Sequence, residues 1–286
     1  MPGSVHAREG PISPPDPRES CTVGRSLKLT SQKTQGDLMV CNRTLVRKLI
    51  SKILPGHRPS MLAKRVRENG LTYLNDQKII RLEQTLKRVR RQHVRGFYLE
   101  FGVALGGSSV LIAKEAQKSQ QPFIGFDVFG MIPEPASTKD DKKSRERYLE
   151  IARGDAIGLS GQEYYGYLDD LYERVQRVFL EYGIPVEPGR VELCKGLFEE
   201  TLPKTRINSI AFAHVDCDWY DPVLYCLNFI ASRLSREIAS RLSRERAIII
   251  DDYFNYGGAR TATDEFILKN PEFHLELGAN VLLTRR

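Results

Sequence analysis

The segment Phe212-Ala213-His214-Val215-Asp216-Cys217-Asp218-Trp219-Tyr220-Asp221 decides the fold of this chain. The run Ile207–Val215 is short and rich in Ile, Phe, Ala and Val, as expected for a strand that is covered on both faces. Asp216 and Asp218 stand two residues apart, so a persisting extended backbone would direct both carboxylates to the same side. The segment predicts a buried strand that ends in a cluster of acids.

A second apolar run, Ala247–Ile250, also ends in paired acids, Asp251 and Asp252. Two such strands can bring four carboxylates to one edge of a parallel sheet, where a hard divalent cation finds the oxygen ligands that it prefers. Without a cation the four charges would repel one another. The alternative gives the acids separate roles: Asp221 before Pro222 as a helix N-cap, and Asp252 as the cap of a turn.

Strand and helix patterns alternate from residue 96 onward. We expect further strands at Gly96–Val103, Phe123–Asp127 and Arg190–Cys194, and helices at Val110–Gln117, Gln162–Tyr182, Pro222–Arg246 and Ala259–Leu268. A terminal hairpin is expected from Phe273–Leu277 and Val281–Thr284. This order predicts an α/β fold, with an open, mostly parallel sheet, one antiparallel terminal strand and helices on both faces.

The remaining segments suggest three further parts. Residues 1–37 are rich in Pro, Gly, Ser and charge, so we expect a disordered tail. Helical spacing of apolar residues between Val40 and His93, with a second helix from about Asn75, predicts a small N-terminal helical cap, 38–95, before the domain 96–286. The irregular stretch 129–162 is long enough to be a functional lid or a disordered segment.

Composition limits the class of protein. The 286 residues are 41% hydrophobic, no apolar run reaches the length of a membrane span, and the amino terminus lacks the apolar core of a signal peptide. Five scattered cysteines without a Cys-x-x-Cys argue against a disulfide framework and a structural zinc site. We therefore expect a cytoplasmic enzyme or binding protein without a membrane partner.

The net charge of +7 is unevenly distributed. Residues 1–95 carry 20 Lys and Arg against 7 Asp and Glu, whereas the rest of the chain is net acidic. Such a basic segment can bind nucleic acid, but it lacks the interleaved aromatics of a single-strand binding groove. Solvated helix faces are the expected explanation, and nucleic acid is not the expected partner.

The sequence also contains a local duplication. Ile230–Glu237 is repeated without change as Ile238–Glu245. Eight residues advance an α-helix by roughly 80° beyond two full turns, so both copies cannot present the same face to a sheet. We expect the extra residues to project or loop out at the end of the sheet opposite the carboxylates.

A glycine-rich turn, Glu100-x-Gly102-x-x-x-Gly106-Gly107, follows the first sheet strand. Its glycines let the backbone approach a ligand at the carboxyl end of that strand. Asp127 ends the next strand and can accept hydrogen bonds from both ribose hydroxyls. The pattern is neither Gly-x-Gly-x-x-Gly nor a P-loop. The turn, the acid after the second strand and the antiparallel terminal strand together favour S-adenosylmethionine over NAD; a nicotinamide-dependent oxidoreductase remains the alternative.

Five motifs in the same order resemble the macrocin O-methyltransferase family, which includes sugar O-methyltransferases of macrolide and aminocoumarin biosynthesis. They are Glu100–Ser109, Lys195–Pro203, Val215–Tyr220, Ile250–Tyr253 and Gly258–Phe266. The resemblance runs from about Gly70 to Arg286. It implies a class I methyltransferase (Rossmann-like) fold and an enzyme that transfers a methyl group to a hydroxyl.

The resemblance also implies particular site residues. Magnesium would be held by Asp216, Asp251 and Asp252, with Asp218 as general base. The residues implied at the S-adenosylmethionine site are Thr72, Tyr73, Glu100, Phe101, Gly102, Val103, Ala104, Gly106, Gly107, Ser108, Asp127, Val128, Phe129, Gly196, Leu197 and Asp216. Asp221 and Leu197 depart from the family, which usually has Glu and a larger aromatic there.

The expected reaction is methyl transfer to a hydroxyl of a small molecule or glycan, most simply a sugar of a glycosylated natural product. Sugar hydroxyls are weak acids, so a metal ion and a base must activate the acceptor. His214 is a rival base, although a packed histidine is the favoured interpretation. A non-catalytic binding protein on the same fold is a further alternative, and a homodimer is compatible with the sequence.

Overall fold

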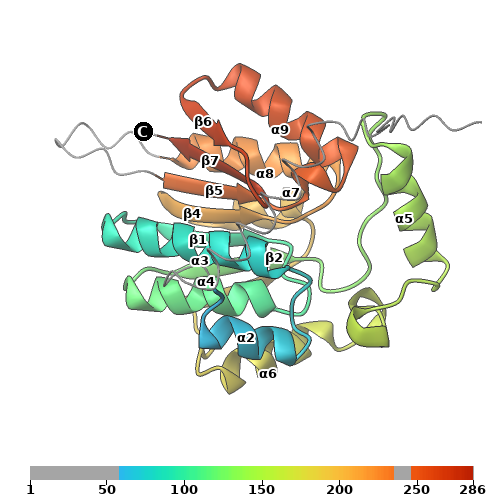
Figure 1. Cartoon of the computed structure of the whole chain (residues 1–286), viewed down its shortest axis with the longest axis horizontal. Helices are drawn as coiled ribbons and strands as arrows, with labels where there is room; N and C mark the ends of the chain where they lie inside the picture. The colour runs from blue at the N-terminus through green and yellow to red at the C-terminus, as the bar shows by residue number, and fades with distance from the viewer. Residues whose placement is uncertain (1–57, 235–245, 286) are drawn as a thin grey trace, which may run out of the picture. The chain divides into compact units, whose positions relative to one another are not determined.

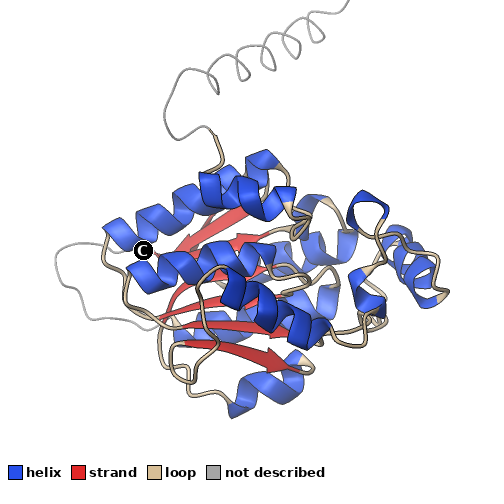
Figure 2. Cartoon of the chain, turned by 90° about the horizontal axis from the view of Figure 1, so that it is seen from below, coloured by secondary structure: helices blue, strands red, loops and turns tan. Residues whose placement is uncertain are grey.

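The computed structural model describes residues 58–234 and 246–285, all of which belong to the unit Leu49–Arg286 (Figures 1 and 2). The predicted tail 1–37, the predicted helix that begins near Val40 and the second copy of the duplicated segment lie outside the described residues. Among the described residues, no helix combines the length and the apolar character needed to cross a bilayer.

A seven-stranded sheet with the strand order β3-β2-β1-β4-β5-β7-β6 forms the centre of the fold. Strands β1 to β5 pair in parallel, whereas β7 lies antiparallel between β5 and β6. The bounds are β1 Phe97–Phe101, β2 Phe123–Asp127, β3 Val191–Lys195, β4 Ile210–Val215, β5 Arg246–Ile250, β6 Phe273–Glu276 and β7 Val281–Arg285. The predicted mostly parallel sheet with one antiparallel terminal strand is confirmed.

Helices cover both faces of this sheet (Figure 1). One apolar core joins a sheet face to α2 (Met61–Glu68), α3 (Asp76–Arg91), α4 (Gly107–Lys118) and α6 (Leu171–Glu181). The other core joins the opposite face to α8 (Tyr220–Arg233) and α9 (Gly257–Lys269). Helix α3 begins where it was expected, because Asn75 accepts hydrogen bonds from the amides of Gln77 and Lys78.

Three predicted elements differ from the structure. The predicted helix Pro222–Arg246 is too long, because α8 ends at Arg233 and Arg246 begins β5. The stretch 129–162 was expected to be irregular, but it contains α5 (Lys142–Ala152), whose first turn is capped by Asp141. The predicted helix Gln162–Tyr182 is too long, because a 3-10 turn at Tyr165–Tyr167 precedes α6. The remaining short elements are α7 Phe198–Thr201 and 3-10 turns at Leu159–Gly161, Leu202–Lys204 and Asp252–Phe254.

Candidate active site

The carboxyl ends of β1 and β4 meet closely at the site. Gly102, directly after β1, has a φ of +94°, and a Cβ on it would lie 1.9 Å from the main-chain oxygen of Asp216. Only glycine permits this approach without moving the backbone. The main-chain amide of Asp216 in turn donates to the oxygen of Phe101 at 2.8 Å. The glycine-rich turn and the first acid-ended strand therefore share one edge of the sheet.

Three carboxylates converge at this edge. Asp216 follows β4, Asp251 and Asp252 follow β5, and each offers an oxygen within 4.8 Å of the other two. Asp251 and Asp252 are buried, with 4% and 5% of their surface exposed. Burial, and then the charges of Asp251 and Asp252, raise the pKa of Asp216 well above its usual range. The cluster therefore favours additional positive charge, and its all-oxygen donor set fits magnesium.

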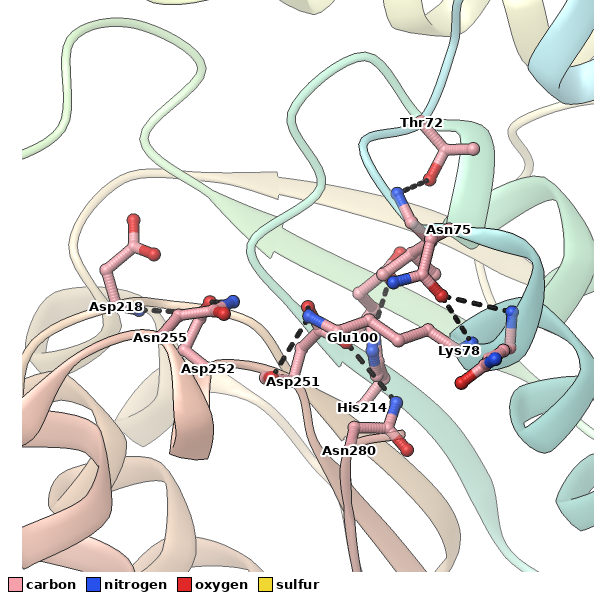
Figure 3. A network of polar contacts seen from close by, with 12 residues as sticks. Thr72, Asn75, Lys78, Glu100, His214, Asp218, Asp251, Asp252, Asn255 and Asn280 are labelled. Atoms are coloured by element: carbon pink, nitrogen blue, oxygen red, sulfur yellow. Dashed lines mark hydrogen bonds and ion pairs between the residues drawn. The ribbon is translucent and has the colours of Figure 1, made fainter. Parts of the chain in front are cut away.

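One cation already reaches the cluster from helix α3. Lys78 Nζ lies 2.5 Å from Oδ2 of Asp251 and 3.3 Å from the same residue's main-chain oxygen (Figure 3). The other carboxylate oxygen of Asp251 accepts from the buried Asn280 at 3.3 Å. The two contacts hold Asp251 in a fixed orientation. Sequence reasoning missed both residues, because each reaches the cluster through tertiary packing alone.

Asp218 stands apart from the three converging acids. Its φ of +59° is left-handed, so the extended backbone on which the expected alignment with Asp216 depended ends before it. Its amide donates to Asp252 Oδ2 at 3.3 Å (Figure 3), so of the three converging acids it contacts Asp252. Burial, and then the charge of Asp252, raise the pKa of Asp218 well above its usual range. A carboxylate with a raised pKa is suited to accept a proton.

Asp127 organises the glycine-rich turn. Its Oδ2 accepts from the amides of Val103 and Ala104 at 2.7 and 2.9 Å, and its Oδ1 accepts from Phe129 at 2.7 Å. A carboxylate has about four acceptor positions, so Oδ1 retains one for a ligand hydroxyl. Asp127 thus connects the end of β2 to the turn after β1 and also lines the adjacent cavity.

That cavity has a volume of about 380 Å³. Six of the residues expected at the cofactor or metal site line it: Gly102, Asp127, Val128, Gly196, Leu197 and Asp216. Apolar walls come from Ile132, Pro133, Phe198 and Trp219, and Asp218 lies beside them. The cavity thus combines the glycine turn, the ribose-binding candidate and the carboxylates.

Other expected site residues do not line the cavity. Glu100 is fully buried; its Oε1 lies 2.8 Å from His214 Nδ1, and its Oε2 accepts from Ser109. The cofactor contact expected of Glu100 stays a prediction, because these two partners already occupy its carboxylate in the structure. Its role is to join β1 to β4 and α4. The further expected cofactor residues that do not line the cavity are Phe101, Val103, Ala104, Gly106, Gly107, Ser108 and Phe129.

His214 is a packed histidine, as favoured from the sequence. It has no exposed surface inside β4. Burial lowers the pKa of His214, but the hydrogen bond and charge of Glu100 outweigh burial and raise it overall. An enclosed imidazole cannot reach an acceptor hydroxyl, so the geometry does not support His214 as the base.

Thr72 and Tyr73 lie next to the glycine turn, although neither lines the cavity. The amide of Gly107 donates to the main-chain oxygen of Leu71 at 2.9 Å, which brings this segment to the start of α4. The half-exposed ring of Tyr73 lies 6.0 Å from the ring of Tyr165, which does line the cavity. The segment is thus positioned beside the expected cofactor site.

We call residues 129–162 the arm. Two neighbouring acids in it cap three helices: Asp140 accepts from the amide of Tyr220 in α8, and Asp141 accepts from those of Gly257 in α9 and Ser144 in α5, all at 2.9 Å. The role of Asp221 as N-cap is therefore wrong, because α8 begins at Tyr220 and a distant carboxylate supplies its acceptor. The sequence signals available for these caps were two pairs of residues, the acids Asp140-Asp141 and the glycines Gly257-Gly258 that face them.

The sheet order, the glycine turn and the acids at the carboxyl ends of β4 and β5 define a class I methyltransferase fold. The family model of macrocin O-methyltransferase (TylF) matches residues 57–272. The chain belongs to this family and is an O-methyltransferase. The alternative of a nicotinamide-dependent oxidoreductase is therefore wrong.

Individual relatives agree with this assignment. The demethyldecarbamoylnovobiocin O-methyltransferase of Streptomyces niveus is 24% identical over 223 residues, which cover 74% of this chain and 76% of the relative. The structure of the O-methyltransferase NovP matches with a TM-score of 0.58 and 21% identity, covering 85% of this chain and 98% of NovP. The SAH-bound methyltransferase PaMTH1 of Podospora anserina has a TM-score of 0.51 at 12% identity, covering 92% and 99%. The structural likenesses show the fold.

Proposed function

We propose that this protein transfers the methyl group of S-adenosylmethionine to a hydroxyl of a sugar in a glycosylated natural product or glycan, and that it requires magnesium. The observation that carries this proposal is the convergence of Asp216, Asp251 and Asp252 beside a cavity that the glycine turn and Asp127 also line. The SAH-bound relative and the relative named for a natural-product acceptor support it.

Each group in the site has a distinct task in this proposal. Asp127 and the turn at Gly102 would bind the nucleoside, and the apolar walls would exclude water and align the acceptor with the methyl group. Asp216, Asp251 and Asp252 would hold magnesium, which when bound lowers the pKa of a coordinated hydroxyl. Asp218 would accept the proton from that hydroxyl at its carboxylate.

A methyl-transfer assay tests the proposal. The full chain is incubated with isotopically labelled S-adenosylmethionine, magnesium and a panel of glycosides, and the products are analysed by mass. We expect one labelled methyl group per product, transfer that stops when EDTA is added, and transfer that Asp251→Asn abolishes. Asp264→Asn is the matched control, because Asp264 is exposed and hydrogen-bonded to Tyr253.

Calorimetry separates the parts of the proposal. Binding of S-adenosylmethionine but not NAD is expected. Absence of S-adenosylmethionine binding would contradict the whole proposal, whereas transfer that resists EDTA would contradict only the metal requirement. Binding without transfer to any glycoside would favour the non-catalytic alternative.

A further inference from the structure

The wall of the cavity is strongly acidic. Among the described residues that line it there is no Lys, Arg or His, whereas the acids are Asp127, Glu134, Asp140, Glu199, Asp216, Asp218 and Asp221. The proposed function uses Asp216 for magnesium, Asp127 for the nucleoside and Asp218 as base. Glu134, Asp140, Glu199 and Asp221 remain without a role in it.

Asp140 differs from the other three because it is buried. Only 2% of its surface is exposed, whereas Glu134, Glu199 and Asp221 are exposed around it. Its Oδ1 accepts from Tyr220, but its Oδ2 is buried and has no hydrogen-bond partner among the described residues. A buried carboxylate oxygen without a donor is destabilising, so this atom requires an explanation.

The fold leaves space for the Asp140 carboxylate. A Cβ on Gly258 would lie 1.9 Å from its Oδ1, so only glycine fits opposite it. Burial raises the pKa of Asp140. The hydrogen bond from Tyr220 lowers this pKa, but the charge of Asp221 raises it further, and the overall shift is upward. Both effects would be relieved by a positive charge at this end of the cavity.

The cations of the arm have other contacts. Lys139 pairs with Glu265 at 2.5 Å and contacts the hydroxyl of Tyr220 at 2.7 Å. Arg145 donates to the main-chain oxygen of Asp140; its charge lowers the pKa of the Asp140 carboxyl, but it makes no hydrogen bond to Oδ2. Arg147 pairs with Glu150 at 2.7 Å. The described part of the arm therefore places no cation on Asp140 Oδ2.

We propose that the methyl acceptor carries a protonated amine, which donates to Oδ2 of Asp140 while Asp221, Glu134 and Glu199 attract it to the cavity mouth. This inference rests on the proposed function and specifies its substrate as an amino sugar or another amine-bearing glycoside. An ammonium–carboxylate hydrogen bond is stronger than a neutral one, so the acid selects for charge. The same wall disfavours phosphates, so a nucleotide-linked sugar should bind more weakly than the amine.

Binding to the full chain with magnesium and S-adenosylhomocysteine tests the proposal by calorimetry. The probes are methyl 2-amino-2-deoxy-β-D-glucopyranoside, its N-acetyl derivative, methyl β-D-glucopyranoside and a uridine diphosphate sugar. We expect the amine to bind at least about tenfold more tightly than the two neutral glycosides, and the nucleotide sugar to bind more weakly than the amine. Added salt should weaken only the binding of the amine.

The variant Asp140→Asn keeps an acceptor for the Tyr220 amide and removes the charge. It should abolish the preference for the amine, while the affinity for S-adenosylhomocysteine and the melting temperature stay unchanged. The control Asp170→Asn removes an exposed acid that pairs with Arg177 and does not line the cavity, so it should keep the preference.

Three results would overturn the inference. The first is equal affinity for the amine and the neutral glycosides. The second is that neither the amine nor the neutral glycosides bind. The third is an Asp140→Asn variant that loses affinity for all glycosides equally. The last result would make Asp140 purely structural. Methyl transfer to neutral glycosides without amine preference would leave the proposed function intact, whereas absence of S-adenosylhomocysteine binding would remove that function itself.

Discussion

The ammonium nitrogen of Lys78 lies 2.5 Å from Oδ2 of Asp251, and this ion pair joins helix α3 to the acidic edge of the sheet. Both side chains are nearly enclosed, with 13% and 6% of their surface exposed. Three carboxylates next to one ammonium leave two negative charges. A bound divalent ion would balance them, so Lys78 and the proposed magnesium ion together would neutralise the cluster.

Replacing Lys78 should have opposite effects on stability and on metal affinity. Lys78→Met leaves Asp251 without its buried partner, so we expect the metal-free protein to lose about 2–4 kcal/mol of unfolding free energy. Because Lys78 competes for an oxygen of Asp251, magnesium should raise the melting temperature more in the variant than in the wild type. Thermal unfolding with and without magnesium measures both effects, with Lys64→Met on the exposed side of α2 as control. A weaker response to magnesium would show that Lys78 helps to build the metal site.

Asp218→Asn should separate catalysis from binding. The amide has nearly the same shape but cannot accept the proton, so kcat should fall by about 10²–10⁴-fold. The affinity for S-adenosylhomocysteine and the melting temperature should not change. Steady-state kinetics and calorimetry give these values. Turnover close to that of the wild type would assign proton removal to water or another group.

The ion pairs of Glu115 predict a pH dependence of stability. Its carboxylate lies 2.6 Å from Arg90 and 3.0 Å from Lys118. Burial alone raises the pKa of Glu115, but the two cations outweigh burial and lower it. A lowered folded pKa gives stability that is present above the unfolded value of 4.5 and lost as the pH falls through the folded value.

Glu115→Gln should therefore be less stable than the wild type by about 1 kcal/mol at pH 7 and by much less at pH 3. Urea unfolding at the two pH values measures the difference. The control is Glu181→Gln, an exposed glutamate at the end of α6. An equal loss at both pH values would show that shape, not charge, matters at this position.

Gly107→Ala should disturb the contact between the glycine turn and the segment before Thr72. A Cβ there would lie 2.3 Å from the main-chain oxygen of Leu71 and 2.8 Å from Val66 Cγ1. We expect a loss of about 1–3 kcal/mol of stability and weaker binding of S-adenosylmethionine. Gly130→Ala is the control for unfolding, because a Cβ at Gly130 meets nothing within 4 Å. Unchanged cofactor affinity would separate the Leu71–Tyr73 segment from the cofactor site.

Deleting Ile238–Glu245 should leave kcat within about twofold of the wild type, since the flanking residues are remote from the acids. Leu234 and Arg246 both contact the end of β7 at Arg285, whereas Asp251 follows the opposite end of β5. The deleted residues lie outside those that the structure describes. Loss of cofactor binding in the deletion variant would show that the duplicated segment has become part of the site.

The sheet could be predicted because its signals are local. Strands β4 and β5 are short apolar runs, β3 and β6 alternate apolar and polar residues, and β2 begins and ends at the expected residues, Phe123 and Asp127. Helix α5 could not be predicted, because it is strongly charged and the residues at its start, Asp140 and Asp141, are held by contacts with α8 and α9. Local signals do not report such tertiary caps.

Only the part of the site that consists of acids at strand ends could be predicted from the sequence. Acids at strand ends identified Asp216, Asp251 and Asp252, because parallel strands place their carboxyl ends together. Lys78, Asn280 and Asp140 come from other parts of the chain and carry no periodic signal. The left-handed backbone at Asp218 was also not visible in the sequence, since a non-glycine residue rarely adopts it.

The adjacent acids Asp140 and Asp141 connect the first turns of α5, α8 and α9 by hydrogen bonds, so we expect these turns to open as one cooperative unit. Displacing their shared peptide breaks the hydrogen bonds to Ser144, Tyr220 and Gly257 together. The amide protons of these three residues should then exchange through one common opening with a single opening rate. If product leaves past the arm, the same rate sets an upper limit on turnover, however fast the methyl transfer itself is.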